Sequence, residues 1–221
     1  MNSVIDQFEK IALVSLEKQA SLIRRLGEHI VELDLDTGIA RFNGDSSFPF
    51  QLLGTESHNS LTWLWAWAEE QPEVSGDLLR SARDLKAWGA REAVSEFALP
   101  SLDLDKADGT MISLIASEVC AASGYYRDDY DGGTLFILLF GANSVQPPQF
   151  DRTGLISAMR DLVSRYDLDH RKTLLSYLTM KNVHFSESGD AVNAELAGGE
   201  RLIAQFDHEG RVITMNGEPL S

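Results

Sequence analysis

The chain has 221 residues, of which 43% are hydrophobic and 24% charged, as is usual for a globular fold and unlike a disordered segment. Its net charge of −15 disfavours binding to nucleic acids and to anionic membranes, because such binding depends on lysine and arginine. The lone cysteine, Cys120, excludes an intrachain disulfide. The N-terminus lacks the pattern of a secretory leader, and the longest apolar runs, such as Leu135 to Phe140, are far shorter than the ~20 residues of a membrane span. We therefore expect a cytoplasmic protein.

Five segments have apolar residues at three- and four-residue steps, which predicts amphipathic helices. Gly27 suits the end of the first helix, and Gly124 the end of the third. Asp151, and either Asp167 or Asp169, are placed to cap the last two helices. The predicted helices are residues 4–26, 75–93, 106–123, 152–166 and 169–181.

Alternation of apolar and polar residues predicts strands joined by short turns. Thr37-Gly38 and Asp131-Gly132-Gly133 are typical turn sequences, so each predicts a hairpin. The final segment predicts a four-stranded meander. The predicted strands are residues 29–36, 39–42, 48–52, 61–67, 96–99, 125–127, 134–140, 182–186, 191–196, 201–206 and 211–215.

Hairpins mixed with helices indicate an α+β fold with antiparallel sheets rather than a parallel α/β fold. Residues 143–149, with Pro147-Pro148, are a candidate linker. We therefore expect an α+β module over residues 1–142. A helical pair with the meander over residues 150–221 is expected to pack on it as one compact unit.

Trp63, Trp65 and Trp67 are spaced by two residues, which places their indoles on one face of a strand. Such a row can line a pocket for a ring, a sugar or a cation, since an indole offers a flat face and an N–H donor. The alternative is that the row packs in the core beneath helices. The two interpretations are compatible if one end of the row is open.

Tyr126 and Arg127 come before a run of aspartates, and Arg127 could bind a carboxylate or phosphate. The aspartates Asp128, Asp129 and Asp131 could hold a cation, but their spacing differs from that of a calcium loop and suits a hairpin turn. Further acids at residues 103, 105 and 108 indicate a helix cap rather than a metal site.

Local catalytic signatures are missing from the sequence. The five histidines do not form a zinc-binding pair, and no phosphate-binding loop or nucleophile elbow occurs. Cys120 lies on the apolar stripe of a predicted helix, where a thiol is normally inert. We therefore predict no metal and no cofactor, and favour a non-catalytic protein, while a catalytic site assembled from distant residues stays open as an alternative.

The segment Leu61-Thr-Trp-Leu-Trp-Ala-Trp-Ala68 resembles a bacterial family known as a domain of unknown function. Members of that family share a Trp-x-Trp-Ala-Trp strand, a Leu-x-x-Trp/Tyr-Gly step and a Gly-x-Tyr-Arg motif before a glycine-rich hairpin. The matching pieces are Leu85-Lys-Ala-Trp-Gly89, Gly124-Tyr-Tyr-Arg127 and Gly132-Gly-Thr134. The resemblance covers residues 48–141 and implies one module built around the tryptophans, with no activity or cofactor to carry over.

Three functions follow as hypotheses. The first is a non-catalytic binding module for a small molecule or peptide, with a pocket lined by Trp63, Trp65, Trp67, Tyr126 and Arg127. The second is an acidic interaction protein, of the immunity or antitoxin type, that neutralises a basic protein partner. The third is an enzyme with a dispersed acidic site.

Overall fold

The computed structural model describes residues 2–68, 74–141, 149–216 and 218–219. Backbone contacts group the chain into two compact units. Unit 1 is Met1–Gln7 with Lys18–Gln146, and unit 2 is Phe8–Glu17 with Pro147–Ser221. The division into domains of residues 1–142 and 150–221 stays a prediction.

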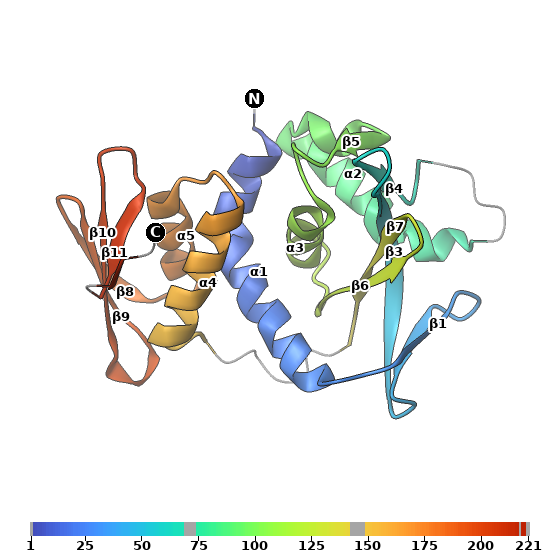
Figure 1. Cartoon of the computed structure of the whole chain (residues 1–221), viewed down its shortest axis with the longest axis horizontal. Coiled ribbons are helices and arrows are strands. Elements are labelled where there is room, and N and C mark those ends of the chain that lie inside the picture. The colour runs from blue at the N-terminus through green and yellow to red at the C-terminus, as the bar shows by residue number, and fades with distance from the viewer. Residues whose placement is uncertain (1, 69–73, 142–148, 217, 220–221) are drawn as a thin grey trace. The chain divides into compact units, whose positions relative to one another are not determined.

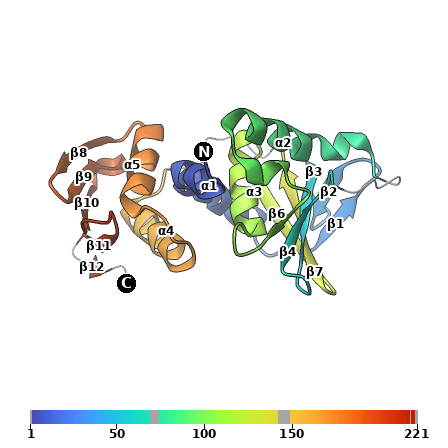
Figure 2. The same cartoon turned by 90° about the horizontal axis from the view of Figure 1, so that it is seen from above.

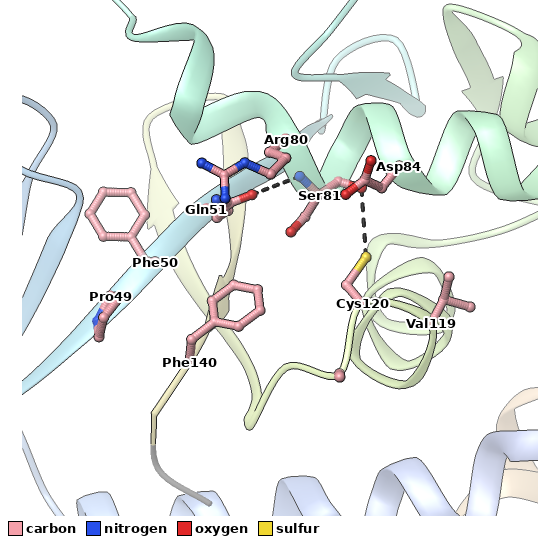
Figure 3. A pocket seen from close by; sticks show the side chains of 10 residues that line it. Pro49, Phe50, Gln51, Arg80, Ser81, Asp84, Val119, Cys120 and Phe140 are labelled. Atoms are coloured by element: carbon pink, nitrogen blue, oxygen red, sulfur yellow. Dashed lines mark hydrogen bonds between the residues drawn. The ribbon is translucent and has the colours of Figure 1, made fainter.

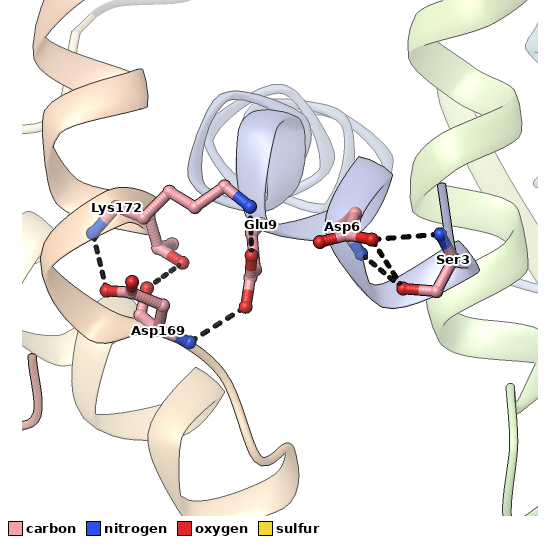
Figure 4. A network of polar contacts seen from close by, with 6 residues as sticks. Ser3, Asp6, Glu9, Asp169 and Lys172 are labelled. Atoms are coloured by element: carbon pink, nitrogen blue, oxygen red, sulfur yellow. Dashed lines mark hydrogen bonds and ion pairs between the residues drawn. The ribbon is translucent and has the colours of Figure 1, made fainter. Parts of the chain in front are cut away.

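The helix α1 (Val4–Leu26) contributes residues to both units. Its start has a reciprocal capping box. Ser3 Oγ accepts a hydrogen bond from the backbone N–H of Asp6, and Asp6 Oδ2 accepts one from the Ser3 N–H (Figure 4). Its end is closed by Gly27, whose N–H donates to the Ile23 carbonyl at 3.0 Å with φ at 59°. The predicted helix and its glycine stop are confirmed.

Unit 1 contains a seven-stranded sheet in which every pair is antiparallel (Figure 1). One edge of the long strand β3 pairs first with β2 and then with β4, and the other edge pairs with β7. The predicted antiparallel α+β class is confirmed. The strands are β1 (Val31–Asp34), β2 (Ile39–Phe42), β3 (Ser46–Ser57), β4 (Thr62–Trp65), β5 (Ser101–Asp103), β6 (Gly124–Tyr130) and β7 (Gly133–Leu139).

Two helices, α2 (Arg80–Glu92) and α3 (Gly109–Val119), lie along one face of this sheet (Figures 1 and 2). A short 3-10 turn, η1 (Gly76–Leu79), precedes α2. Helix α3 is buried along most of its length, which fits a helix that is apolar on nearly every side. Asp108 caps α3 by accepting from the Met111 N–H at 2.7 Å. The helix ends before the predicted stop at Gly124, since Ala121 takes a left-handed conformation.

The predicted strand over residues 96–99 is wrong. The chain forms a 3-10 turn there, η2 (Ser95–Ala98), and the strand β5 starts after Pro100. The turn brings Phe97 against α2, with the Phe97 ring 5.6 Å from Trp65. A Cβ at Gly89 would lie 2.5 Å from the Phe97 Cβ, so this approach requires glycine in α2.

Unit 2 contains two helices, α4 (Arg152–Arg165) and α5 (His170–Met180), and an antiparallel meander. The predicted caps Asp151 and Asp169 are confirmed, each accepting a backbone N–H three residues later. The four predicted strands occur, followed by the short strand β12, which was not expected. The strands are β8 (His184–Ser188), β9 (Ala191–Glu195), β10 (Arg201–Phe206), β11 (Val212–Met215) and β12 (Glu218–Pro219), with a 3-10 turn, η3 (Ala197–Gly199), between β9 and β10.

Two buried glutamates of α1 bind partners within unit 2. Glu17, with 1% of its surface exposed, accepts from the Tyr177 hydroxyl at 2.6 Å and pairs with Lys181. Glu9 accepts from the Asp169 N–H at 2.8 Å and pairs with Lys172 Nζ at 2.8 Å (Figure 4). These contacts join residues 8–17 to α5 by charge as well as by packing.

Candidate functional site

The three predicted tryptophans lie together in unit 1. Trp63 and Trp65 belong to β4 and expose 0% and 1% of their surface, whereas Trp67 follows the strand and is half-buried. The rings of Trp63 and Trp65 meet edge to face at 5.4 Å, and those of Trp65 and Trp67 are stacked at 6.3 Å. The first two members of the row therefore lie in the core.

The indole N–H groups of Trp63, Trp65 and Trp67 are buried without a hydrogen-bond partner among the described residues. Buried tryptophans usually place this N–H against an acceptor, and an unpaired buried donor costs about 1–3 kcal/mol. The ammonium of Lys86 lies 3.6 Å from the centre of the Trp67 ring, a favourable cation–π contact. The row is thus densely packed, and its three indole N–H donors have no acceptor among the described residues.

Tyr126 and Arg127 are neighbours in β6, so their side chains point to opposite faces of the sheet. The Tyr126 ring lies 5.4 Å from Phe42 and 5.5 Å from His29, in edge-to-face contacts. Arg127 donates to Asp129 at 2.8 Å, with half of its side chain exposed. The structure therefore does not gather all five residues at one point, and the aromatic pocket they were expected to line stays a prediction.

Arg127 belongs instead to a polar relay that reaches the turn between β3 and β4. His58 Nε2 lies 3.1 Å from Thr134 Oγ1, and the Thr134 hydroxyl donates to Asp129 Oδ1 at 2.8 Å. Arg127 Nη2 donates to the same carboxylate oxygen. Hydrogen bonds from Arg127 and then Thr134 lower the pKa of Asp129.

This relay fixes the tautomer of the neutral His58 ring. Thr134 gives its only hydroxyl hydrogen to Asp129, so its oxygen accepts from Nε2 of His58. Nδ1 is left as the hydrogen-bond acceptor on an exposed turn. The sequence does not indicate this contact, because His58 and Thr134 are 76 positions apart.

A cavity of about 490 Å³ opens in unit 1 between β3, α2 and the end of α3, and we call it the α2–α3 cavity. Its volume falls within the range of roughly 300–1,000 Å³ that is typical of ligand sites. Figure 3 shows charged and polar side chains of α2 opposite two phenylalanine rings. The lining residues are Pro49, Phe50, Gln51, Arg80, Ser81, Asp84, Val119, Cys120, Ala121 and Phe140.

Hydrogen bonds hold the walls of this cavity in place. Gln51 Oε1 accepts from the Ser81 N–H at 2.7 Å, which satisfies an otherwise orphan donor in the first turn of α2. Gln51 Nε2 donates to the Asp77 carbonyl at 3.1 Å, and the Cys120 thiol lies 3.6 Å from the Ser81 carbonyl. The walls are therefore preorganised, as is usual in ligand sites.

The environment of the Cys120 thiol disfavours the reactive thiolate. Burial is the main cause that raises its pKa to about 11, and the charge of Asp84 adds to the shift. The expectation of an inert thiol agrees with this environment.

Neither a metal centre nor a membrane span emerges from the part of the chain that the structure describes. Its histidine, cysteine and acidic side chains form no group of three or more that is arranged to hold a metal ion. None of its helices combines the length and the apolar character needed to cross a bilayer.

The sequence did not indicate the α2–α3 cavity, because its walls come from segments spread over residues 49–140. The local signal was limited to Leu85 and Ala82, which mark the buried side of α2. Arg80 and Asp84 lie on the other side of this amphipathic helix, which usually faces solvent.

Comparison with known proteins places the candidate sites in a recognised sequence region. Residues 5–142 match the model described as "Family of unknown function (DUF6882)". This span includes all seven strands of the unit 1 sheet, the tryptophan row, the relay and the α2–α3 cavity. No curated protein and no solved structure matches the chain.

Proposed function

The chain belongs to the family of unknown function DUF6882, and on this premise we propose that unit 1 is a non-catalytic binding module whose ligand occupies the α2–α3 cavity. The observation that carries the proposal is a cavity of ligand size with both charged and aromatic walls. A cytoplasmic, bacterial setting, as expected from the sequence, is part of the same proposal.

The walls favour a small ligand that has both polar and apolar parts. Arg80 and Asp84 are four residues apart on α2, so a guanidinium and a carboxylate lie on one side of the cavity. Phe50 and Phe140 provide apolar surface on the other side (Figure 3). The raised pKa of Cys120 argues against covalent chemistry and supports reversible binding.

The test is native mass spectrometry of the protein purified gently from its own host, together with three variants. Arg80→Gln and Asp84→Asn should lose the retained molecule, whereas the control Arg91→Gln, an exposed arginine later in α2, should keep it. Where the ligand dissociates during purification, a thermal-shift screen of host metabolites should distinguish the same variants. A molecule that all variants retain equally would overturn the cavity as its site.

The tryptophan row is a second candidate location for the ligand. The specific observation in its favour is the set of three buried indole N–H groups without partners in the described residues. A ligand that accepts a hydrogen bond from the half-buried Trp67 should shift the tryptophan emission in the parent protein and in Arg80→Gln alike. Trp67→Phe should weaken such a ligand and leave a cavity ligand unaffected.

The interaction protein remains an alternative, motivated by the charge of −15. A basic protein in the native mass spectrum would favour it, provided that the complex weakens strongly with salt.

The enzyme alternative rests on His58 and Asp129, which are joined through Thr134, rather than on Asp128 or Asp131. A His58→Gln variant that leaves ligand binding and every measurable phenotype unchanged would count against it.

A further inference from the structure

A second cavity, of about 340 Å³, lies in unit 2 at the elbow between α4 and α5, and we call it the elbow cavity. Side chains from three elements line it. Arg165 comes from the end of α4, His170 from the start of α5, and Arg211 from the connection between β10 and β11. Two arginines therefore line one cavity in a chain with a net charge of −15.

The ring of His170 is held in one tautomer. The backbone N–H of Val212 donates to His170 Nδ1 at 3.0 Å, so this nitrogen is unprotonated. The hydrogen of the neutral ring is therefore on Nε2, which is a donor. Burial first, and then the charge of Arg211, lowers the pKa of His170, which keeps the ring neutral at physiological pH.

The two arginines retain most of their donors for a ligand. In the ranges that the structure describes, the Arg211 side chain makes one ion pair, from Nε to Glu209 Oε2 at 3.4 Å, and no ion pair involves Arg165. One carboxylate, that of Asp167, also lines the cavity, so its formal charge is +1. The nearby carboxylates of Asp169 and Asp207 already accept backbone N–H groups.

We propose that the elbow cavity binds a small molecule through a phosphate group held by Arg165, Arg211 and His170. Guanidinium groups match phosphate oxygens with paired donors, and a neutral Nε2–H adds a third donor from another direction. Three donors from separate elements suit a tetrahedral anion better than a planar carboxylate. The cavity volume lies at the lower end of the range for ligand sites, so it has room for more than a bare ion.

The test is a titration of the full chain with inorganic phosphate and, separately, with glycerol phosphate, followed by ¹H–¹⁵N NMR. Both should produce saturable shifts at the amides of His170 and Arg211, and acetate should bind more weakly. Tight binding of glycerol phosphate would identify a phosphorylated metabolite as the ligand source, and preference for inorganic phosphate would identify the free ion.

Matched variants distinguish a built site from general charge attraction. Arg165→Gln and Arg211→Gln should each weaken phosphate about tenfold, the effect of losing one charge-assisted hydrogen bond. The control Arg160→Gln, at an exposed position of α4 outside the cavity, should leave binding unchanged, and Asp167→Asn should strengthen it. Thermal melting verifies that each variant folds. Shifts that do not saturate, equal effects of all three arginine variants, or acetate binding as tight as phosphate would overturn the proposal.

Discussion

Glu17 is a buried carboxylate of unit 2 with three partners. Its carboxylate accepts from the Tyr177 hydroxyl and from the Phe150 N–H at 2.8 Å, and it pairs with Lys181. Burial first, and then the hydrogen bond to the Glu17 carboxylate, raises the pKa of Tyr177. Removing one member of such a network leaves the others buried without compensation.

We predict that Glu17→Ala lowers the free energy of unfolding by about 3 kcal/mol, since a broken buried ion pair strands its partners. The control is Glu195→Ala, at an exposed glutamate of β9, which should change it by less than about 0.5 kcal/mol. Urea denaturation of both variants measures the difference. A loss for Glu17→Ala no larger than that of the control would contradict the network.

Thr134 connects two exposed groups through a fully buried hydroxyl, since it has 0% of its surface exposed. Thr134→Val keeps the shape of the side chain and removes the hydroxyl, which should cost about 1 kcal/mol. It should also release the preference of His58 for the Nε2–H tautomer. Ring ¹⁵N shifts measure the tautomer, and an unchanged tautomer ratio in Thr134→Val would show that the relay does not set it.

His170 gives unit 2 a pH dependence of known sign. Its pKa lies below the ordinary value of 6.5 in the folded chain, so the unfolded chain takes up a proton first as the pH falls. The contribution of neutral His170 to the free energy of unfolding is complete above about pH 6.5. It is lost as the pH falls from 6.5 toward the lower pKa of the folded chain. Between about pH 7.5 and 5.5 the parent should therefore lose more stability than His170→Gln. Equal losses in denaturant melts at the two pH values would refute this assignment.

At the scale of elements, close approaches between glycine and aromatic rings organise unit 1. A Cβ at Gly54 of β3 would lie 2.3 Å from the Trp63 ring and 2.5 Å from the Leu64 carbonyl. A Cβ at Gly109, the first residue of α3, would lie 2.5 Å from the Phe136 ring. Without side chains at these points, α3 and the indoles can approach the sheet directly.

Gly54→Ala should therefore destabilise unit 1 by at least about 2 kcal/mol, because neither the indole nor the carbonyl can move away cheaply. Gly76→Ala is the control, since its nearest neighbour would be the Arg83 guanidinium at 3.5 Å. It should be neutral or slightly stabilising. Thermal melting followed by near-UV circular dichroism of the tryptophans reports on both. A Gly54→Ala variant as stable as the control would show that the packing is looser than described.

At the scale of the whole molecule, the dominant property is the charge of −15. Like charges repel one another in the compact state and less in the expanded unfolded chain. Raising sodium chloride from about 10 mM to 150 mM shortens the screening length from roughly 30 Å to 8 Å, so the melting temperature should rise. Sucrose of equal osmolality is the non-ionic control. A fall in melting temperature would mean that ion pairs such as Glu9 with Lys172 outweigh the repulsion.

Much of the local structure could be predicted because its causes are local. Caps at Ser75, Asp108, Asp151 and Asp169 bond backbone groups two or three residues away, and alternation in β4 puts Trp63 and Trp65 into mutual contact. The prediction of a strand over residues 96–99 is wrong because the burial of Phe97 against Gly89 overrides the local sequence pattern.

The sequence by itself determined the helices, the hairpins and the antiparallel α+β class, since periodicity and turn chemistry act over a few residues. Only the tertiary structure decided that His58 meets Thr134 and that the α2–α3 and elbow cavities exist. It also decided that Tyr126 packs with Phe42 rather than with the tryptophans. These features depend on which strands pair and on which helix ends lie close together. The free energy of long-range packing determines that choice, and no local sequence pattern encodes it.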